Sequence, residues 1–226
     1  MRQKYALSRL SELRSPVGAA IAVVCALATL LVGCAAPVAS TVPPAVPPPP
    51  GQIAANCAAP TYASDVLVCA DPQLRALDAR MVDAWSSLDL ASVLAPGAWV
   101  EQQQEWFKRR SLCAFSERHA DCLRGAYTER IAVLEALQRV ASRPARQGTA
   151  TVCRDAPWGV AELRLRAPET GALTIEDRNA RVVAAATARR PDSPWQPYVV
   201  FGVDGGTVRL TATSGATIDC SLFGVH

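Results

Sequence analysis

An uncharged run from Ser15 to Cys34 is the feature that most constrains what this chain can fold into, because it decides the compartment in which the chain folds. The run follows a basic segment, residues 2–14, and consists mainly of Val, Ala, Leu and Ile. Its length approaches that of a membrane-spanning helix, so a retained signal anchor is one interpretation. No charged stop-transfer block follows, because Ala35, Ala36 and Pro37 come next. We therefore predict a secretory signal over residues 1–33 that is removed.

The end of this run, Leu31-Val32-Gly33-Cys34, resembles a bacterial lipobox. In that motif, small residues before the cut admit a signal peptidase, and the cysteine thiol receives diacylglycerol. The resemblance implies a lipoprotein held to the membrane through acyl chains, palmitate among them, on Cys34. Ala35 after the cysteine, rather than Asp, predicts an outer-membrane location facing the periplasm in a cell with two membranes.

Residues 34–55 are predicted to be the acylated cysteine and a tether, because PVASTVPPAVPPPPG favours extended polyproline II. The first 33 residues carry four basic residues and one acid, a net charge of +3. That is also the charge of the whole chain, so the mature protein has a formal charge of zero. Its charge therefore gives no electrostatic basis for binding nucleic acid.

Six cysteines remain beyond the tether, and an even number in an exported chain predicts a disulfide framework. They are Cys57, Cys69, Cys113, Cys122, Cys153 and Cys220. They divide four and two around ASRPARQGT at 141–149, which predicts a domain boundary. The expected fold class is α+β in two domains: a small disulfide-linked three-helix domain over 56–143, then a small antiparallel β-barrel over 144–226.

Three amphipathic segments predict the helices of the first domain. The first begins at Asp71-Pro72, where Asp can cap free amides and Pro fits the first turn, and its apolar stripe reaches Leu88. Ala95-Pro96-Gly97 then interrupts the chain. A second helix is expected from Trp99 to about Cys113, and a third from about Cys122 to Leu137.

Four cysteines allow three connectivities. If the first two helices form an antiparallel hairpin, Cys69 lies beside Cys113, and Cys57 is left for Cys122. This argument favours one pairing without excluding the others. A zinc site is the alternative, but the spacings of 12, 44 and 9 contain no Cys-x-x-Cys pair, so we predict no metal and no cofactor.

Residues 56–138 resemble the LprI N-terminal domain family. The resemblance is carried by Asn56-Cys57, by Val68-Cys69-Ala70-Asp71-Pro72-Gln73-Leu74, by Leu77-Asp78, by Gln103 with Trp106, Arg109-Arg110 and Cys113, and by Cys122-Leu123 with Tyr127 and Arg130-Ile131. It implies a small disulfide-linked helical domain of exported bacterial proteins, some of which are associated with lysozyme inhibition.

The polar and aromatic residues of this domain have mostly structural interpretations. Trp85 and Trp106 stand at helical spacing and are expected in the core. Asp78 and Arg109 either form an inter-helix ion pair or stay solvated. The block 108–110, Lys-Arg-Arg, is interpreted as a solvated helix face rather than as an anion-binding surface.

The second domain shows strand patterns. Apolar residues alternate with charged ones over 161–167, and further strands are expected at 173–175, 182–183, 198–203, 207–212 and 217–222. Asp204-Gly205-Gly206 predicts a hairpin turn. Cys153 and Cys220 are predicted to join the first strand to the last, closing a loop of about 68 residues for roughly 4 kcal/mol.

This outline is similar to the C-terminal domain of membrane-bound lysozyme inhibitors of c-type lysozyme. Ser193 and Tyr198 stand at that family's serine segment, and Asp204 falls near its lysine position. The resemblance implies that Ser193, Tyr198 and Asp204 are candidate partner-binding residues. The chain departs from the family at Pro194, where the family has glycine, and at Asp204, which catalytic carboxylates would repel. The alternative places Ser193 in a loop and Tyr198 in the barrel core.

No motif for catalysis stands out: the chain has no Gly-x-Ser-x-Gly, no His-Glu-x-x-His and no glycine-rich phosphate loop. We therefore expect no enzyme. The favoured hypothesis is a cell-envelope lipoprotein that binds a protein partner, with lysozyme as the candidate. The alternative is a structural or assembly factor of the envelope without inhibitory activity. An acidic patch would favour lysozyme binding, because lysozyme is cationic and the net charge is zero.

Overall fold

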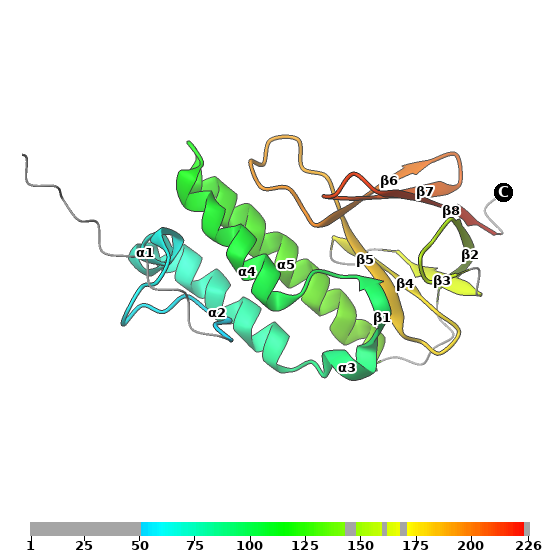
Figure 1. Cartoon of the computed structure of the whole chain (residues 1–226), viewed down its shortest axis with the longest axis horizontal. Helices are drawn as coiled ribbons and strands as arrows, with labels where there is room; N and C mark the ends of the chain where they lie inside the picture. The colour runs from blue at the N-terminus through cyan, green and yellow to red at the C-terminus, as the bar shows by residue number, and fades with distance from the viewer. Residues whose placement is uncertain (1–50, 143–147, 160–161, 168–170, 224–226) are drawn as a thin grey trace, which may run out of the picture. The chain divides into compact units, whose positions relative to one another are not determined.

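The computed structural model describes residues 51–142, 148–159, 162–167 and 171–223 (Figure 1). The predicted leader, Cys34 and the tether up to residue 50 lie outside the described residues. All described residues belong to one compact unit. Within them, no helix is both long enough and apolar enough to cross a membrane.

The N-terminal part of this unit is helical. Its first long helix begins where predicted, because the Asp71 side chain accepts hydrogen bonds from the amides of Gln73 and Leu74 and proline occupies the first turn. Helix α2 packs chiefly along α5, the longest helix, around Leu74, Met81 and Leu134. The described helices are α1 (Ala63–Ala70), α2 (Pro72–Ser86), α3 (Leu90–Val93), α4 (Gln103–Ser111) and α5 (His119–Ser142), with a short 3₁₀ helix η1 (Leu112–Phe115).

The C-terminal part is a barrel. Among the described residues, seven strands close in the order β5-β4-β3-β2-β8-β7-β6 and back to β5. All neighbours are antiparallel except β5 and β6, which run parallel. The predicted barrel is thus confirmed, but it is not wholly antiparallel. Its strands are β2 (Thr149–Arg154), β3 (Leu163–Arg166), β4 (Ala172–Glu176), β5 (Val182–Ala188), β6 (Val199–Asp204), β7 (Thr207–Ala212) and β8 (Thr217–Leu222).

An eighth strand, β1 (Leu94–Trp99), comes from the helical part and pairs in parallel with β5. The prediction of a chain break at 95–97 and of a helix from Trp99 is therefore wrong, and α4 begins only at Gln103. The reason is the edge position: β1 has a partner on one side only, so Pro96 can sit in the strand although it has no amide to donate. From the sequence alone, proline and glycine here indicate a break between helices, because the edge position of β1 is not visible in the sequence.

The two parts share a core. Helix α5 covers β4 and β5 (Figure 1), and Val133, Leu137 and Val140 of α5 pack with Val182 and Ala185 of β5. The described residues form five α-helices and one 3₁₀ helix, rather than the three helices predicted. This packing explains why nearly every residue of β5 is buried, since the helices cover the outside of the barrel there.

Each part also lends a segment to the other. Trp195, from the loop between β5 and β6, lies in the helical core with Trp106 and Leu123. In return, Ala95 of β1 lies in the barrel core, and Trp99 packs against it. The two predicted domains are therefore interlocked in the compact unit.

The disulfides join neighbours in sequence: Cys57 to Cys69, Cys113 to Cys122, and Cys153 to Cys220. The last pair is as predicted, and its cysteines stand opposite each other on β2 and β8. The favoured pairing of Cys69 with Cys113 and of Cys57 with Cys122 is wrong. The hairpin on which it depended does not form as assumed, because α2 packs chiefly on α5 and strand β1 separates it from α4.

Candidate functional site

The three candidate partner-binding residues do not converge. Ser193 is half-buried in the β5–β6 loop, Tyr198 is half-buried just before β6, and Asp204 is exposed at the far end of that strand. Tyr198 and Asp204 are six residue steps apart along an extended strand, or about 20 Å. The turn Asp204-Gly205-Gly206 does link β6 to β7 as predicted, with Asp204 paired to Thr207. A single contact loop formed by all three residues is therefore not what the fold offers.

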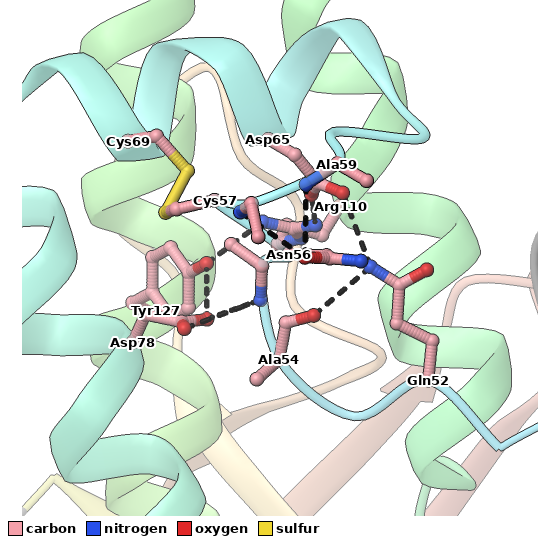
Figure 2. The surroundings of a disulfide bond; sticks show 12 residues. Gln52, Ala54, Asn56, Cys57, Ala59, Asp65, Cys69, Asp78, Arg110 and Tyr127 are labelled. Carbon is pink, nitrogen blue, oxygen red and sulfur yellow. Dashed lines mark hydrogen bonds and ion pairs between the residues drawn. A yellow bond between two sulfur atoms is a disulfide. The ribbon is translucent and has the colours of Figure 1, made fainter.

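A buried polar network occupies the helical part near the Cys57–Cys69 disulfide, as Figure 2 shows. Arg110 is fully buried and pairs with Asp65 at 2.5 Å. Its guanidinium also donates to the Tyr127 hydroxyl at 2.7 Å, and that hydroxyl donates to Asp78 at 2.8 Å. The backbone amide of Ala55 donates to the same carboxylate. The network ties the N-terminal lead to four helices, α1, α2, α4 and α5.

Burial sets the ionisation of this network. It raises the pKa of the Asp78 carboxyl above its ordinary value, although hydrogen bonds from Tyr127 and Ala55 act in the opposite direction. It also raises the pKa of the Tyr127 phenol far above its usual range. Arg110 is sandwiched, with its guanidinium 4.1 Å from the ring centre of Phe107 and 5.6 Å from that of Tyr127.

Two predictions about these charges are corrected. Asp78 and Arg109 neither pair nor stay solvated: Asp78 joins the network, and Arg109 pairs with Glu101 at 2.6 Å. In the block 108–110 only Lys108 lies on a solvated face, because Arg110 is buried and Arg109 packs on Trp195, 4.0 Å from its ring centre. Adjacent helix positions face different directions, so three consecutive charges cannot share one surface.

A second chain of contacts links α4 and α5. Arg130 is buried and donates to the Gln103 side chain at 2.9 Å and to the Glu101 carbonyl at 2.9 Å. Trp106 is fully buried nearby, as predicted, and Trp85 is partly buried against the same core. Most of the polar residues quoted for the LprI resemblance, Asp78, Gln103, Arg109, Arg110, Tyr127 and Arg130, thus lie in these two networks. In this chain the pattern describes a scaffold rather than an exposed site.

The β5–β6 loop rests on helix α5 at Gly125. A Cβ there would lie 2.6 Å from Ser193 Oγ and 2.8 Å from Trp195 Cβ, both too close for real contacts. Arg118 reaches the same loop and donates to the carbonyl of Asp192 at 2.8 Å. The absence of a side chain at residue 125 therefore allows the loop to sit down on the helix.

A cavity of about 310 Å³ lies beside this seat, between α5 and the β5–β6 loop. Glu129 of α5 and Arg190 of the loop both line it, together with Ser193 and Trp195. Burial raises the pKa of the Glu129 carboxyl to about 7, although Arg130 and Arg109 nearby act to lower it. The indole N–H of Trp195 also approaches the carboxylate and lowers its pKa, but without the geometry of a hydrogen bond.

The 3₁₀ helix η1 forms an exposed apolar turn in the helical part. Leu112 and Phe115 of η1 are 62% and 84% exposed, although large apolar side chains usually avoid water. They flank Cys113, whose disulfide to Cys122 ties the turn to α5. Val66, 55% exposed, lies on α1, which packs against η1.

Sequence reasoning missed the cavity and the apolar turn. Glu129 stands among ordinary helix residues, and nothing in its neighbourhood signals burial by a loop more than 60 positions away. Gly125 was a usable signal, because a glycine inside a helix often marks a close approach by another segment. No group of three or more His, Cys, Asp or Glu side chains that could hold a metal occurs in the described part of the chain.

Comparisons of the chain with protein-family models, with curated proteins and with solved structures found no match.

Proposed function

We propose that this chain is a cell-envelope lipoprotein, held in the membrane through acyl groups on Cys34, that binds a protein partner. Lysozyme is the partner to test first. The leader and lipobox support the anchor, and three cysteine pairs suit a chain that folds in an oxidising compartment.

The observation that carries the binding role is the exposed turn η1. Phe115 and Leu112 present apolar surface to water on a turn fixed by the Cys113–Cys122 disulfide. Removing such surface from water on contact is favourable, and little conformational entropy is lost when the turn is already held. Aromatic anchors of this kind carry much of the energy of protein contacts.

Charge gives this contact no general assistance. The mature chain has a formal charge of zero, so attraction to a cationic partner such as lysozyme would have to come from local groups. Ser193 lies in the loop before β6 and Asp204 at the far end of that strand, so the proposal does not depend on both entering one cleft. The apolar turn is the favoured contact instead.

The test is inhibition of a c-type lysozyme by the oxidised, unacylated protein of residues 51–226, kept whole because its two parts are interlocked. We expect inhibition that falls about tenfold or more in Phe115→Ser, as expected for loss of an aromatic anchor. The matched control is Val203→Ser, which removes a similarly exposed apolar side chain, 64% exposed, from the barrel.

Loss of inhibition in Val203→Ser alone would contradict the role of η1 and move the contact to the hairpin that carries Asp204. No inhibition by the folded protein, with its disulfides confirmed by mass, would reject lysozyme of this type as the partner. That result would favour a structural or assembly role in the envelope.

A further inference from the structure

The cavity between α5 and the β5–β6 loop has the dimensions of a small-ligand site. Its volume of about 310 Å³ stands at the lower end of the roughly 300–1,000 Å³ found for such sites. Leu77, Ile131 and Ala132 give it an apolar wall, and charged side chains stand at other points of its lining. This mixture of apolar wall and few polar groups is typical of sites that orient a ligand.

Three polar atoms of residues that line the cavity are buried without a hydrogen-bond partner: Glu129 Oε2, Trp195 Nε1 and Thr187 Oγ1. Trp195 and Thr187 are each only 6% exposed. Leaving buried polar atoms without a well-formed hydrogen bond is unfavourable, and the approach of the Trp195 N–H to the Glu129 carboxylate relieves this only in part. Their grouping points to a polar occupant.

The arginine side chains near Glu129 have other hydrogen-bond and ion-pair partners. Arg109 pairs with Glu101, and Arg130 donates to Gln103 and to a backbone carbonyl. At the rim, Arg80 pairs with Glu135 at 2.5 Å. Neither Glu129 nor the exposed Arg190 has an ion-pair partner among the described residues, and both line the cavity.

We propose that this cavity binds a small zwitterion of the amino-acid type. Its ammonium group contacts Glu129, its carboxylate contacts Arg190, and its hydrocarbon side chain lies against Leu77, Ile131 and Ala132. One unpaired acid and one unpaired base on the same small cavity match the two charges of such a molecule, and the apolar wall matches its side chain. This site is independent of the contact proposed for η1.

Titration calorimetry with three matched probes tests this proposal on the oxidised protein of residues 51–226. Leucine carries both charges, 3-methylbutylamine lacks the carboxylate, and 4-methylpentanoate lacks the ammonium. We expect saturable binding of leucine, and binding about tenfold or more weaker for each analogue, because each loses one charge-assisted contact. Equal binding of leucine and either analogue would contradict the role of the missing charge.

Two variants assign the charges. Glu129→Gln and Arg190→Gln are each expected to weaken leucine binding about tenfold or more. The control is Arg189→Gln, because Arg189 is an exposed neighbour that lines the adjoining hollow together with Arg190 but does not line the cavity. Circular dichroism of each variant confirms folding, and Arg190→Gln changes an exposed side chain that makes no hydrogen bond in the described structure.

A proton signal separates a direct contact from a structural effect. With a Glu129 pKa of about 7, leucine bound at pH 6 should release a proton from this carboxyl. The measured heat should then vary with the ionisation heat of the buffer, and this variation should vanish in Glu129→Gln. Absence of saturable leucine binding to the folded protein, or binding unchanged in both variants, would overturn the proposal.

Discussion

The helical part and the barrel bury polar groups in opposite ways. The helical part holds two buried arginines, Arg110 and Arg130, together with buried Asp65, Asp78 and Glu101. The one charged side chain buried in the described part of the barrel is Glu176, which pairs with Arg166. The barrel therefore depends on apolar packing and on its strand ladder, whereas the helical part adds directional contacts to its apolar core.

The two parts differ in their buried charges because strand pairing fixes the alignment of neighbouring strands, whereas helix packing leaves the alignment of neighbouring helices less defined. Strand pairing fixes register through the backbone, because a slip of one residue moves every side chain to the other face. Short helices such as α1 and α4 have no such ladder between them, and apolar contacts alone permit several alignments. We infer that the bonds from Arg110 to Asp65 and Tyr127 select one alignment of α1, α4 and α5.

Among the substitutions considered, we expect the largest loss of stability at Arg110 in the helical part. Arg110→Ala leaves the buried Asp65 carboxylate unpaired, removes a donor from Tyr127 and opens a cavity. We expect a loss of about 5 kcal/mol in the free energy of unfolding, measured by chemical denaturation. The control in the barrel is Arg209→Ala, where an exposed, solvent-screened pair with Asp219 is lost and we expect little change in stability. Similar losses at both positions would contradict the proposed difference.

The second-largest effect is expected at the seam between the two parts, which is the contact of Gly125 on α5 with Ser193 and Trp195 of the β5–β6 loop. Gly125→Ala would place a Cβ against Ser193 Oγ and Trp195 Cβ. The Ser193 hydroxyl can rotate away, but Trp195 is anchored in the helical core, so the loop must move. Alanine favours helix over glycine by about 1 kcal/mol, which offsets part of the strain, and we expect a net loss of about 2 kcal/mol.

Gly202→Ala on β6 is the matched control for the seam. A Cβ there meets nothing within 4 Å, so its effect should stay within about 0.5 kcal/mol. Hydrogen exchange of residues 189–198 distinguishes undocking of the loop from general destabilisation. Unchanged protection of this segment in Gly125→Ala would show that the seam tolerates the extra methyl group.

The smallest expected effect concerns Glu129 and depends on pH. Its carboxyl titrates near pH 7 in the folded protein instead of at its ordinary 4.5, so the folded state holds the proton more tightly. Between these two pH values the unfolded chain loses its proton first, and stability falls as pH rises. Above about pH 7 the loss is complete.

Glu129→Gln removes this dependence, because the amide does not titrate. The variant should gain about 1–2 kcal/mol relative to the wild type between pH 4.5 and pH 8, after allowance for the partial exposure of this side chain. Denaturation curves across that window provide the measurement. Glu105→Gln, which changes an exposed carboxylate on α4, should show no such gain. A flat difference for Glu129→Gln would reject the raised pKa.

Much of the fold could be predicted from the sequence. The Asp71-Pro72 start of α2, the barrel strands other than β2, the turn at Asp204 and the Cys153–Cys220 bridge all depend on local patterns that the tertiary structure leaves intact. Such patterns survive because capping, alternation and turn chemistry act over a few residues.

The remaining features depend on distant partners. Strand β1 contains Pro96 and Gly97 and becomes a strand only because β5 lies beside it. The burial of Arg110 requires Asp65 and Tyr127 from two other helices, so its sequence neighbourhood resembles that of an exposed base. The candidate cavity was missed for the same reason, since it exists only where the loop around Trp195 meets α5.

The connectivity of the disulfides bears on how the molecule is made. Each of the six cysteines in the described part of the chain is bonded to its immediate neighbour among them, first with second, third with fourth and fifth with sixth. A chain that emerges from a ribosome or a translocation channel with its N-terminus first exposes these partners pair by pair. An oxidant that joins each new thiol to the free thiol preceding it would produce the native set, with no wrong bond left for an isomerase to repair.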